Sequence, residues 1–401
     1  LFGGTIVNNA TFTATAPAGT LQMFGNGGGV NAFNNQGGGS FVANGPGTVR
    51  VFFLNNALPF NNAGSVSVQA GTLQISSGGM STGGFTVAAG ATLAFPFDYT
   101  FAAGSSASGA GSFQFTGGTQ TLSADQTFPN LTLNNPIGME VGPGSLTVGG
   151  PFQWISGTLV AKTIVPATGS LTLDTGNHEL NGELDLNGPA TWTAGNIGVG
   201  GGTIVNNATF TATAATSQTL QMFGNGAGVN AFNNQAGGSF IVNGPGTVRV
   251  FFLNSALPFN NAGSVSVQSG ILHLESASSH SGDFDGQAGA TLLFLGNQTF
   301  AASSHINGNL NLEIDSGTDT YPNGLNTTGT VTFRGGSFTI GGNVSGGTLA
   351  FTGGTGVLNG AVNSTNSLSI TGGKFVLGGA LTTHYGGAPF LTPTVRGYLL
   401  S

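Results

Sequence analysis

Charge and cysteine are what this sequence has least of. Of its 401 residues, six are Lys or Arg and thirteen are Asp or Glu, or 5% together, and cysteine is absent. Six basic side chains cannot neutralise the run of phosphates that a nucleic acid presents, so no nucleic-acid partner is expected. Without cysteine, a disulfide scaffold and a Cys-ligated metal site are excluded as well.

Long apolar runs and a targeting leader are also missing. No apolar run approaches the ~18 residues of a membrane-spanning helix, so no membrane span is expected. The chain starts at Leu1 without a basic, apolar leader. We therefore expect any secretion signal to have been removed or to lie outside this sequence.

Glycine and short alternating segments are abundant. Gly accounts for 73 residues and Phe for 31, and 39% of the chain is hydrophobic. Apolar and polar residues alternate in segments such as TFTAT, SFVAN and SVSVQ, a pattern typical of β-strands. Gly and Asn between these segments supply the positive φ angles of tight corners. No window shows a sustained 3.6-residue period, so essentially no α-helix is expected.

The chain is internally duplicated. The 52 residues from Thr20 to Gly71 match those from Thr219 to Gly270 at 46 positions. The similarity continues more weakly on both sides of this block. The sequence therefore predicts one repeat unit at residues 1–198 and a second, continuous with it, at 199–383. Residues 384–401 leave the Gly/Asn rhythm and form an atypical tail.

A shorter period inside each unit is marked by pairs of asparagines that recur at a nearly constant interval. Short strands at constant spacing favour an all-β, single-chain parallel β-helix (a β-solenoid) with about 25 residues per coil. Stacked Asn amides would then form hydrogen-bonded ladders along the coil axis. A tandem of β-sandwiches is the alternative, but it does not explain the recurrence of one corner motif. The ladder candidates are Asn8, Asn9, Asn34, Asn35, Asn61, Asn62, Asn206, Asn207, Asn233, Asn234, Asn260 and Asn261.

Strand alternation also assigns an inward and an outward face. In the segment TVRVFFLN it places Val49, Val51 and Phe53 inward and Arg50 outward. Arg249 has the equivalent position in the second unit. Two interpretations of these arginines stay open. They are strand charges that discourage lateral pairing, or they make a repeated contact with a neighbouring subunit or a glycan.

Phrases such as FNNAGSVSVQAGTL, GGFTVAAGATLAF and TGGTQTLSADQTF resemble the Gly/Asn/Thr-rich repeats of large secreted bacterial surface proteins. These include autotransporter passengers and filamentous-haemagglutinin-like adhesins. The resemblance implies a right-handed β-helix, an extracellular or cell-surface location in a bacterium, and a structural or adhesive role. It transfers no catalytic residue. The Ca²⁺-binding nonapeptide of such proteins cannot be carried over, because the GGxG strings here lack its Asp.

Catalytic chemistry has little support in the sequence. The best acidic groups are Glu183/Asp185, Asp283/Asp285 and Glu313/Asp315, whose members lie two residues apart and so face one side of a strand. Such a pair could bind Ca²⁺, but we favour the interpretation that the carboxylates are solvated outward positions. The acids fall where the two copies differ, and no histidine pair has metal spacing. We therefore expect no enzyme and no cofactor, and a polysaccharide-cleaving β-helix is the remaining enzymatic alternative.

The two ends of the sequence suggest self-association. Leu1 enters directly at the repeat boundary with no polar capping segment before it, whereas the tail is apolar. The tail could cap its own chain or add a strand to a neighbour. We therefore expect copies of the chain to stack end to end as an extracellular filament. An adhesin stalk that binds cell-surface or matrix glycans is the alternative. The subunit-contact candidates are Leu1, Phe2, Phe390, Leu391, Val395, Tyr398, Leu399 and Leu400.

Overall fold

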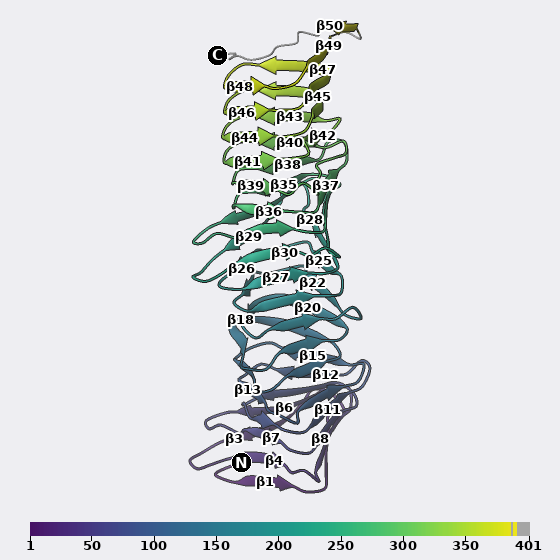
Figure 1. The fold of residues 1–401 in the computed structure, drawn as a ribbon. Helices are drawn as coiled ribbons and strands as arrows, with labels where there is room; N and C mark the ends of the chain where they lie inside the picture. Colours follow the sequence, from purple (N-terminus) through teal and green to yellow (C-terminus); the bar gives the residue numbers. More distant parts are fainter. Residues whose placement is uncertain (386–387, 391–401) are drawn as a thin grey trace. The chain divides into compact units, whose positions relative to one another are not determined.

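The computed structural model describes residues 1–385 and 388–390. These residues form a parallel β-solenoid without α-helix, as the sequence predicts. They contain no helix long and apolar enough to span a membrane. The chain divides into two compact units, Leu1–Pro189 and Ala190–Ser401. In each unit successive coils are stacked in register, and each coil contributes strands to three faces (Figure 1).

We name the faces of unit 1 after the residues that mark them. The Asn face comprises β1 (Thr5–Asn8), β4 (Ala32–Asn35), β7 (Phe60–Asn62), β10 (Met80–Ser81), β13 (Tyr99–Phe101), β16 (Gln120–Leu122) and β23 (His178–Leu180). The Thr face comprises β2 (Thr11–Thr15), β5 (Ser40–Asn44), β8 (Ser65–Val68), β11 (Gly84–Val87), β14 (Ser106–Ser108), β17 (Gln126–Phe128), β19 (Leu146–Val148), β21 (Thr163–Val165) and β24 (Glu183–Leu186). The Arg face comprises β3 (Thr20–Gly25), β6 (Thr48–Phe53), β9 (Thr72–Ser76), β12 (Thr92–Phe95), β15 (Ser112–Phe115) and β22 (Ser170–Leu173). Two longer strands, β18 (Leu131–Val141) and β20 (Pro151–Leu159), run from the Arg face to the Asn face.

The faces of unit 2 are named by the same kinds of residues. Its Asn face comprises β27 (Thr203–Asn206), β30 (Ala231–Asn234), β33 (Phe259–Asn261), β36 (Ser278–His280), β39 (Gln298–Phe300), β41 (Thr318–Tyr321), β44 (Ser337–Ile340), β46 (Thr355–Leu358) and β48 (Lys374–Leu377). The Thr face comprises β25 (Ala190–Trp192), β28 (Thr209–Thr213), β31 (Ser239–Asn243), β34 (Ser264–Val267), β37 (Asp283–Gly286), β42 (Leu325–Asn326) and β49 (Leu381–Tyr385). The Arg face comprises β26 (Ile197–Val199), β29 (Thr219–Gly224), β32 (Thr247–Phe252), β35 (Ile271–Leu274), β38 (Thr291–Phe294), β40 (Asn311–Ile314) and β43 (Thr330–Phe333). Two strands, β45 (Val344–Phe351) and β47 (Val362–Ile370), run across both of the last two faces. One short strand, β50 (Ala388–Phe390), folds back antiparallel on β49.

Coil length varies along each unit. In the longer class, Thr5 of β1 pairs with Ala32 of β4, whereas in the shorter class Leu325 of β42 pairs with Val344 of β45. The longer coils hold the Asn pairs and carry an extra loop between the Arg face and the Asn face. The expected coil length of about 25 residues therefore lies between the lengths of the longer and the shorter coils.

Aromatic side chains stack along the interior and give the core its continuity. In unit 1, Phe33 lies parallel to Phe60 with 5.2 Å between ring centroids, and Phe41 meets Phe60 edge to face. In unit 2, Phe232 and Phe259 repeat this stack at 4.9 Å. All of these rings are buried. Because the chain carries few charges, burial of this apolar aromatic surface is its main source of stability.

Glycine fixes some of the corners. Gly71 has φ of +65°, and a Cβ there would lie 2.1 Å from the carbonyl oxygen of Gly47 in the preceding coil. A side chain at this position would thus strain the backbone and push two coils apart. The equivalent Gly270 has φ of +71° and the same close approach, to Gly246.

The inward assignment of Phe53 is wrong, although that of Val49 and Val51 is confirmed. Both valines are buried, whereas Phe53 is 46% exposed. Strand β6 ends at Phe53, and the chain turns outward because the N–H groups of Leu54 and Asn55 both donate to the carbonyl of Gly25. The ring of Phe53 packs on the surface ring of Phe97, with 5.3 Å between centroids.

Candidate functional site

The Asn face of unit 1 holds a buried amide ladder. The Nδ2 of Asn8 donates to Oδ1 of Asn35, and the Nδ2 of Asn35 donates to Oδ1 of Asn62, both at 2.8 Å. Asn35 also donates to the carbonyl of Ser65 at 2.9 Å. The ladder ends at Ser81, whose hydroxyl is 3.3 Å from Nδ2 of Asn62. Each rung satisfies the rung of the next coil, so the amides are buried with partners.

Unit 2 repeats this ladder and then changes its chemistry. Asn206 donates to Asn234 at 2.7 Å, and Asn234 donates to Asn261 at 2.8 Å. The next rung is His280, whose Nε2 lies 2.8 Å from Oε1 of Gln298. Burial lowers the pKa of His280 to about 4, although its bond to Gln298 opposes the shift. This histidine is therefore a neutral part of the core at pH 7.

A second, outward row of amides lies beside each ladder. Asn61 donates to Asn34 at 2.9 Å, and Asn260 donates to Asn233 at 2.9 Å. The outward amides border a surface hollow of about 110 Å³ in unit 1 and of about 380 Å³ in unit 2. Both hollows also include a glutamine that follows the Asn pair, Gln36 in unit 1 and Gln235 in unit 2.

The first asparagine pair of each unit does not follow the others. The register aligns Asn8 with Asn35 and aligns Val7, rather than an Asn, with Asn34. Asn9 comes after the strand and is exposed. Asn207 likewise follows β27 and is exposed. Neither residue is aligned with the ladder asparagines of the later coils, because its pair is shifted by one position relative to the later pairs.

The two predicted arginines lie on the Arg face, each over a phenylalanine ring. The Cζ of Arg50 lies 4.6 Å from the ring centroid of Phe52, and the Cζ of Arg249 lies 4.1 Å from that of Phe251. Arg249 forms a salt bridge through Nε with Glu275, whose side chain is only 9% exposed. His273 lies 3.2 Å from the same carboxylate oxygen.

The three acidic pairs each meet a basic group. Glu183 lies 2.7 Å from Lys162, and Arg334 lies 3.1 Å from Glu313 and 3.7 Å from Asp315. In residues 1–385 and 388–390 no three His, Asp or Glu side chains converge in a way that could hold a metal ion. Sequence reasoning missed these ion pairs, since each one joins two successive coils and its members are distant in sequence.

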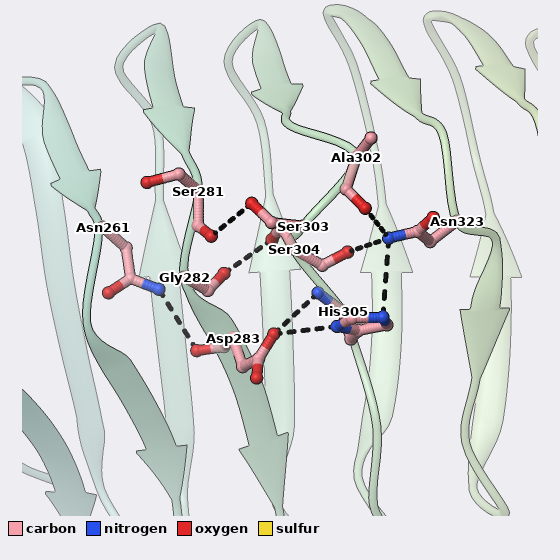
Figure 2. Close-up of polar contacts among 9 residues, drawn as sticks. All are labelled: Asn261, Ser281, Gly282, Asp283, Ala302, Ser303, Ser304, His305 and Asn323. Atoms are coloured by element: carbon pink, nitrogen blue, oxygen red, sulfur yellow. Dashed lines mark hydrogen bonds and ion pairs between the residues drawn. The ribbon is translucent and has the colours of Figure 1, made fainter. Parts of the chain in front are cut away.

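Asp283 meets His305 on the surface of unit 2 (Figure 2). The Nδ1 of His305 lies 3.1 Å from Oδ1 of Asp283, which also accepts the backbone N–H of His305 at 2.9 Å. On its other side, Nε2 of His305 lies 3.5 Å from Nδ2 of Asn323. A carboxylate that orients an imidazole is one part of a hydrolase site.

The serines beside this dyad do not complete it. Figure 2 shows the hydroxyls of Ser303 and Ser304 directed at the preceding coil, where they donate to the carbonyls of Ser281 and Gly282 at 3.0 and 2.6 Å. Neither hydroxyl is paired with the ring of His305. With side chains 50% and 58% exposed, His305 and Asp283 form a solvated surface contact of the kind that contributes little to stability.

The subunit-contact candidates lie at the two ends of the chain. The amino group of Leu1 donates to the carbonyl of Phe24 at 2.7 Å, and Phe2 is 77% exposed. Phe390 is the last residue of β50. Leu391, Val395, Tyr398, Leu399 and Leu400 lie outside the described residues.

Comparison with known proteins identifies no relative. The chain matches no family model, no curated protein and no solved structure.

Proposed function

We propose that this protein is a structural β-solenoid, the subunit of an extracellular filament or surface fibre in which copies stack coil upon coil. One observation carries the proposal. The coils of unit 1 bind one another through parallel, in-register pairing of short uncharged strands, and the edge of a coil offers the same backbone groups to a coil of a second copy. Within the described residues β1, β2 and β3 each pair with one strand only, β4, β5 and β6 respectively.

The free edge of β2 illustrates the chemistry. Ser40 donates to the carbonyl of Ala10 at 2.7 Å, and Ala16 donates to that of Asn44 at 2.9 Å. Backbone groups alternate in direction along a parallel strand, so those of Thr13 point away from β5. An unpaired row of this kind is a template for another strand. A preceding coil, from this chain or from a second copy, would complete the pairing.

The outward residues of the same strand favour such stacking. Thr11, Thr13 and Thr15 are neutral and exposed. Charged edge residues are the usual defence against edge-to-edge association, and none is present in β2. The scarcity of charge across the chain also keeps like-charge repulsion between stacked copies low. An extracellular, bacterial setting agrees with the resemblance to secreted repeat proteins.

The test is a matched pair of proline substitutions. Thr13→Pro removes an N–H that faces the free edge and should leave the fold intact. Thr211→Pro alters the equivalent residue of β28, which pairs with β25 on one side and β31 on the other, and should destabilise unit 2. Light scattering at rising protein concentration and negative-stain microscopy then report assembly.

We expect the intact chain to form filaments and Thr13→Pro to remain folded but monomeric. A monodisperse intact chain at high concentration would refute the proposal. Filaments of unchanged length in Thr13→Pro would show that the free edge of β2 has no part in them.

A stalk that presents a glycan-binding surface is a second candidate. It is favoured by the outward amide rows, which occur with their hollows in both units. Amide groups both donate and accept hydrogen bonds, as sugar hydroxyls require. Binding on a glycan array that is lost in Asn34→Ala plus Asn233→Ala, without any polymer, would support this function over the first.

A further inference from the structure

The Arg face of each unit carries a group of one arginine and two phenylalanines, which we call the platform. In unit 1 it consists of Arg50, Phe52 and Phe24, and the two rings have centroids 5.5 Å apart. In unit 2 it consists of Arg249, Phe251 and Phe223, and the rings are 5.6 Å apart. The platform lies in the block that the two copies share almost unchanged.

In unit 2, a carboxylate from the same unit binds the arginine of the platform. Glu275 follows β35 directly and forms the salt bridge with Nε of Arg249. His273, which pairs in register with Arg249, lies 3.2 Å from the same carboxylate oxygen. The arginine is 34% exposed and the glutamate 9%, so the pair is partly shielded from water. The charge of this arginine therefore has an internal partner.

Unit 1 has the platform without the carboxylate. At the positions of His273 and Glu275 it has Gln74 and Ser76. Ser76 pairs in register with Phe52, and Gln74 pairs with Arg50. Both residues therefore lie on the next coil, beside the platform. No ion pair within the described residues includes Arg50.

Two polar atoms in unit 1 are left without partners at this place. The Nε of Arg50 and the Oγ of Ser76 are both buried and make no hydrogen bond in the described part of the chain. Ser76 is 7% exposed. A buried donor without a partner costs about 1–3 kcal/mol, and more when it is charged. The cost disappears if an anion from outside binds where Glu275 binds in unit 2.

We propose that Arg50 and Ser76 bind the carboxylate of an acidic sugar, a uronate. Arg50 supplies the guanidinium and Ser76 a hydroxyl donor, which together match a carboxylate. Gln22 and Gln74 flank Arg50 in register and offer amides to the sugar hydroxyls. The ring of Phe24, next to that of Phe52, offers an apolar face. This site lies on the Arg face and does not depend on filament formation.

The internal duplication provides the test. Ser76→Glu copies the arrangement of unit 2 and should block the site with an internal carboxylate. Glu275→Ser copies unit 1 and should open a second site. Calorimetric titration with a trimer of galacturonate in the presence of EDTA measures affinity and stoichiometry. The methyl ester of the same trimer, which lacks the charge, is the ligand control, and galacturonate monomer distinguishes a free sugar acid from a chain.

We expect one site per intact chain, about 10- to 100-fold weaker binding of the ester, no site in Ser76→Glu and two sites in Glu275→Ser. Thermal unfolding checks that each variant is folded. If Glu275→Ser fails to fold, the Ser76→Glu comparison still decides. Equal binding of acid and ester, unchanged binding in Ser76→Glu, or no binding by the intact chain would overturn the proposal.

Discussion

The buried ladder makes a sharp prediction, because inward and outward amides alternate along one strand. Asn35 makes three hydrogen bonds through its side chain, to Asn8, Asn62 and the carbonyl of Ser65. Replacing it by Ala removes all three, and each contributes about 1 kcal/mol. It also leaves Oδ1 of the buried Asn62 without this donor. The expected loss in the free energy of unfolding is therefore about 3–5 kcal/mol for Asn35→Ala.

The adjacent Asn34 is the control. Its side chain is half-buried and accepts one bond, from Asn61 at 2.9 Å. Asn34→Ala should cost about 1 kcal/mol or less, because water can replace the lost partner. Urea unfolding followed by circular dichroism measures both variants, and hydrogen exchange of the amides of β4 and β7 locates the change. Equal losses for the two variants would refute the ladder as a stabilising element.

Three further predictions concern buried groups and a corner. Burial raises the pKa of Asp319 from 3.8 to about 7, so this residue should make the intact chain less stable as the pH rises from 4 to 7. Asp319→Asn should therefore recover up to about 4 kcal/mol of the free energy of unfolding above pH 7, measured by urea titrations at several pH values. His280, with its pKa lowered from 6.5 to about 4, acts in the opposite direction: the stability it contributes is complete above pH 6.5 and is lost towards pH 4. Stability of the Asp319→Asn variant should therefore rise from pH 4 to 6.5 by up to about 3 kcal/mol, and a flat profile would contradict this. Gly71→Ala should lower the melting temperature by several degrees, since a Cβ would meet Gly47 O at 2.1 Å, and an unchanged value in differential scanning calorimetry would count against the close packing of these corners.

The periodic features of this fold could be predicted from the sequence, because every coil repeats the same physical problem. The recurrence of Asn35 and Asn62 at one spacing indicated both the solenoid and the stacking of their amides. Alternation identified Val49 and Val51 as core residues. These inferences depend only on the period of a strand and the period of a coil.

Positions that depart from the strand period or the coil period could not be predicted from the sequence. Asn9 lies outside the ladder because its pair is shifted by one residue, and a shift of one moves a side chain to the opposite face. Phe53 lies at the end of its strand, where a loop rather than alternation decides direction. The meeting of Asp283 with His305 depends on a coil of 22 residues, which differs from the coils that the Asn pairs define.

The unpaired groups of the Arg face were also beyond sequence reasoning. Alternation placed Arg50 outward but could not show that its Nε is buried and lacks a partner. The duplication carried the signal, since Ser76 and Glu275 differ at one aligned position of otherwise similar copies. The meaning of that difference depends on the salt bridge to Arg249, which only the three-dimensional arrangement supplies.

The proposed filament requires that copies of this chain continue one another's coils. Cryo-electron microscopy of the intact chain at high concentration tests it most directly. Stacking of this kind predicts filaments in which the strand spacing of ~4.8 Å runs along the filament axis and passes without interruption from one copy to the next. Isolated monomers, or filaments whose strands run parallel to the axis, would contradict it.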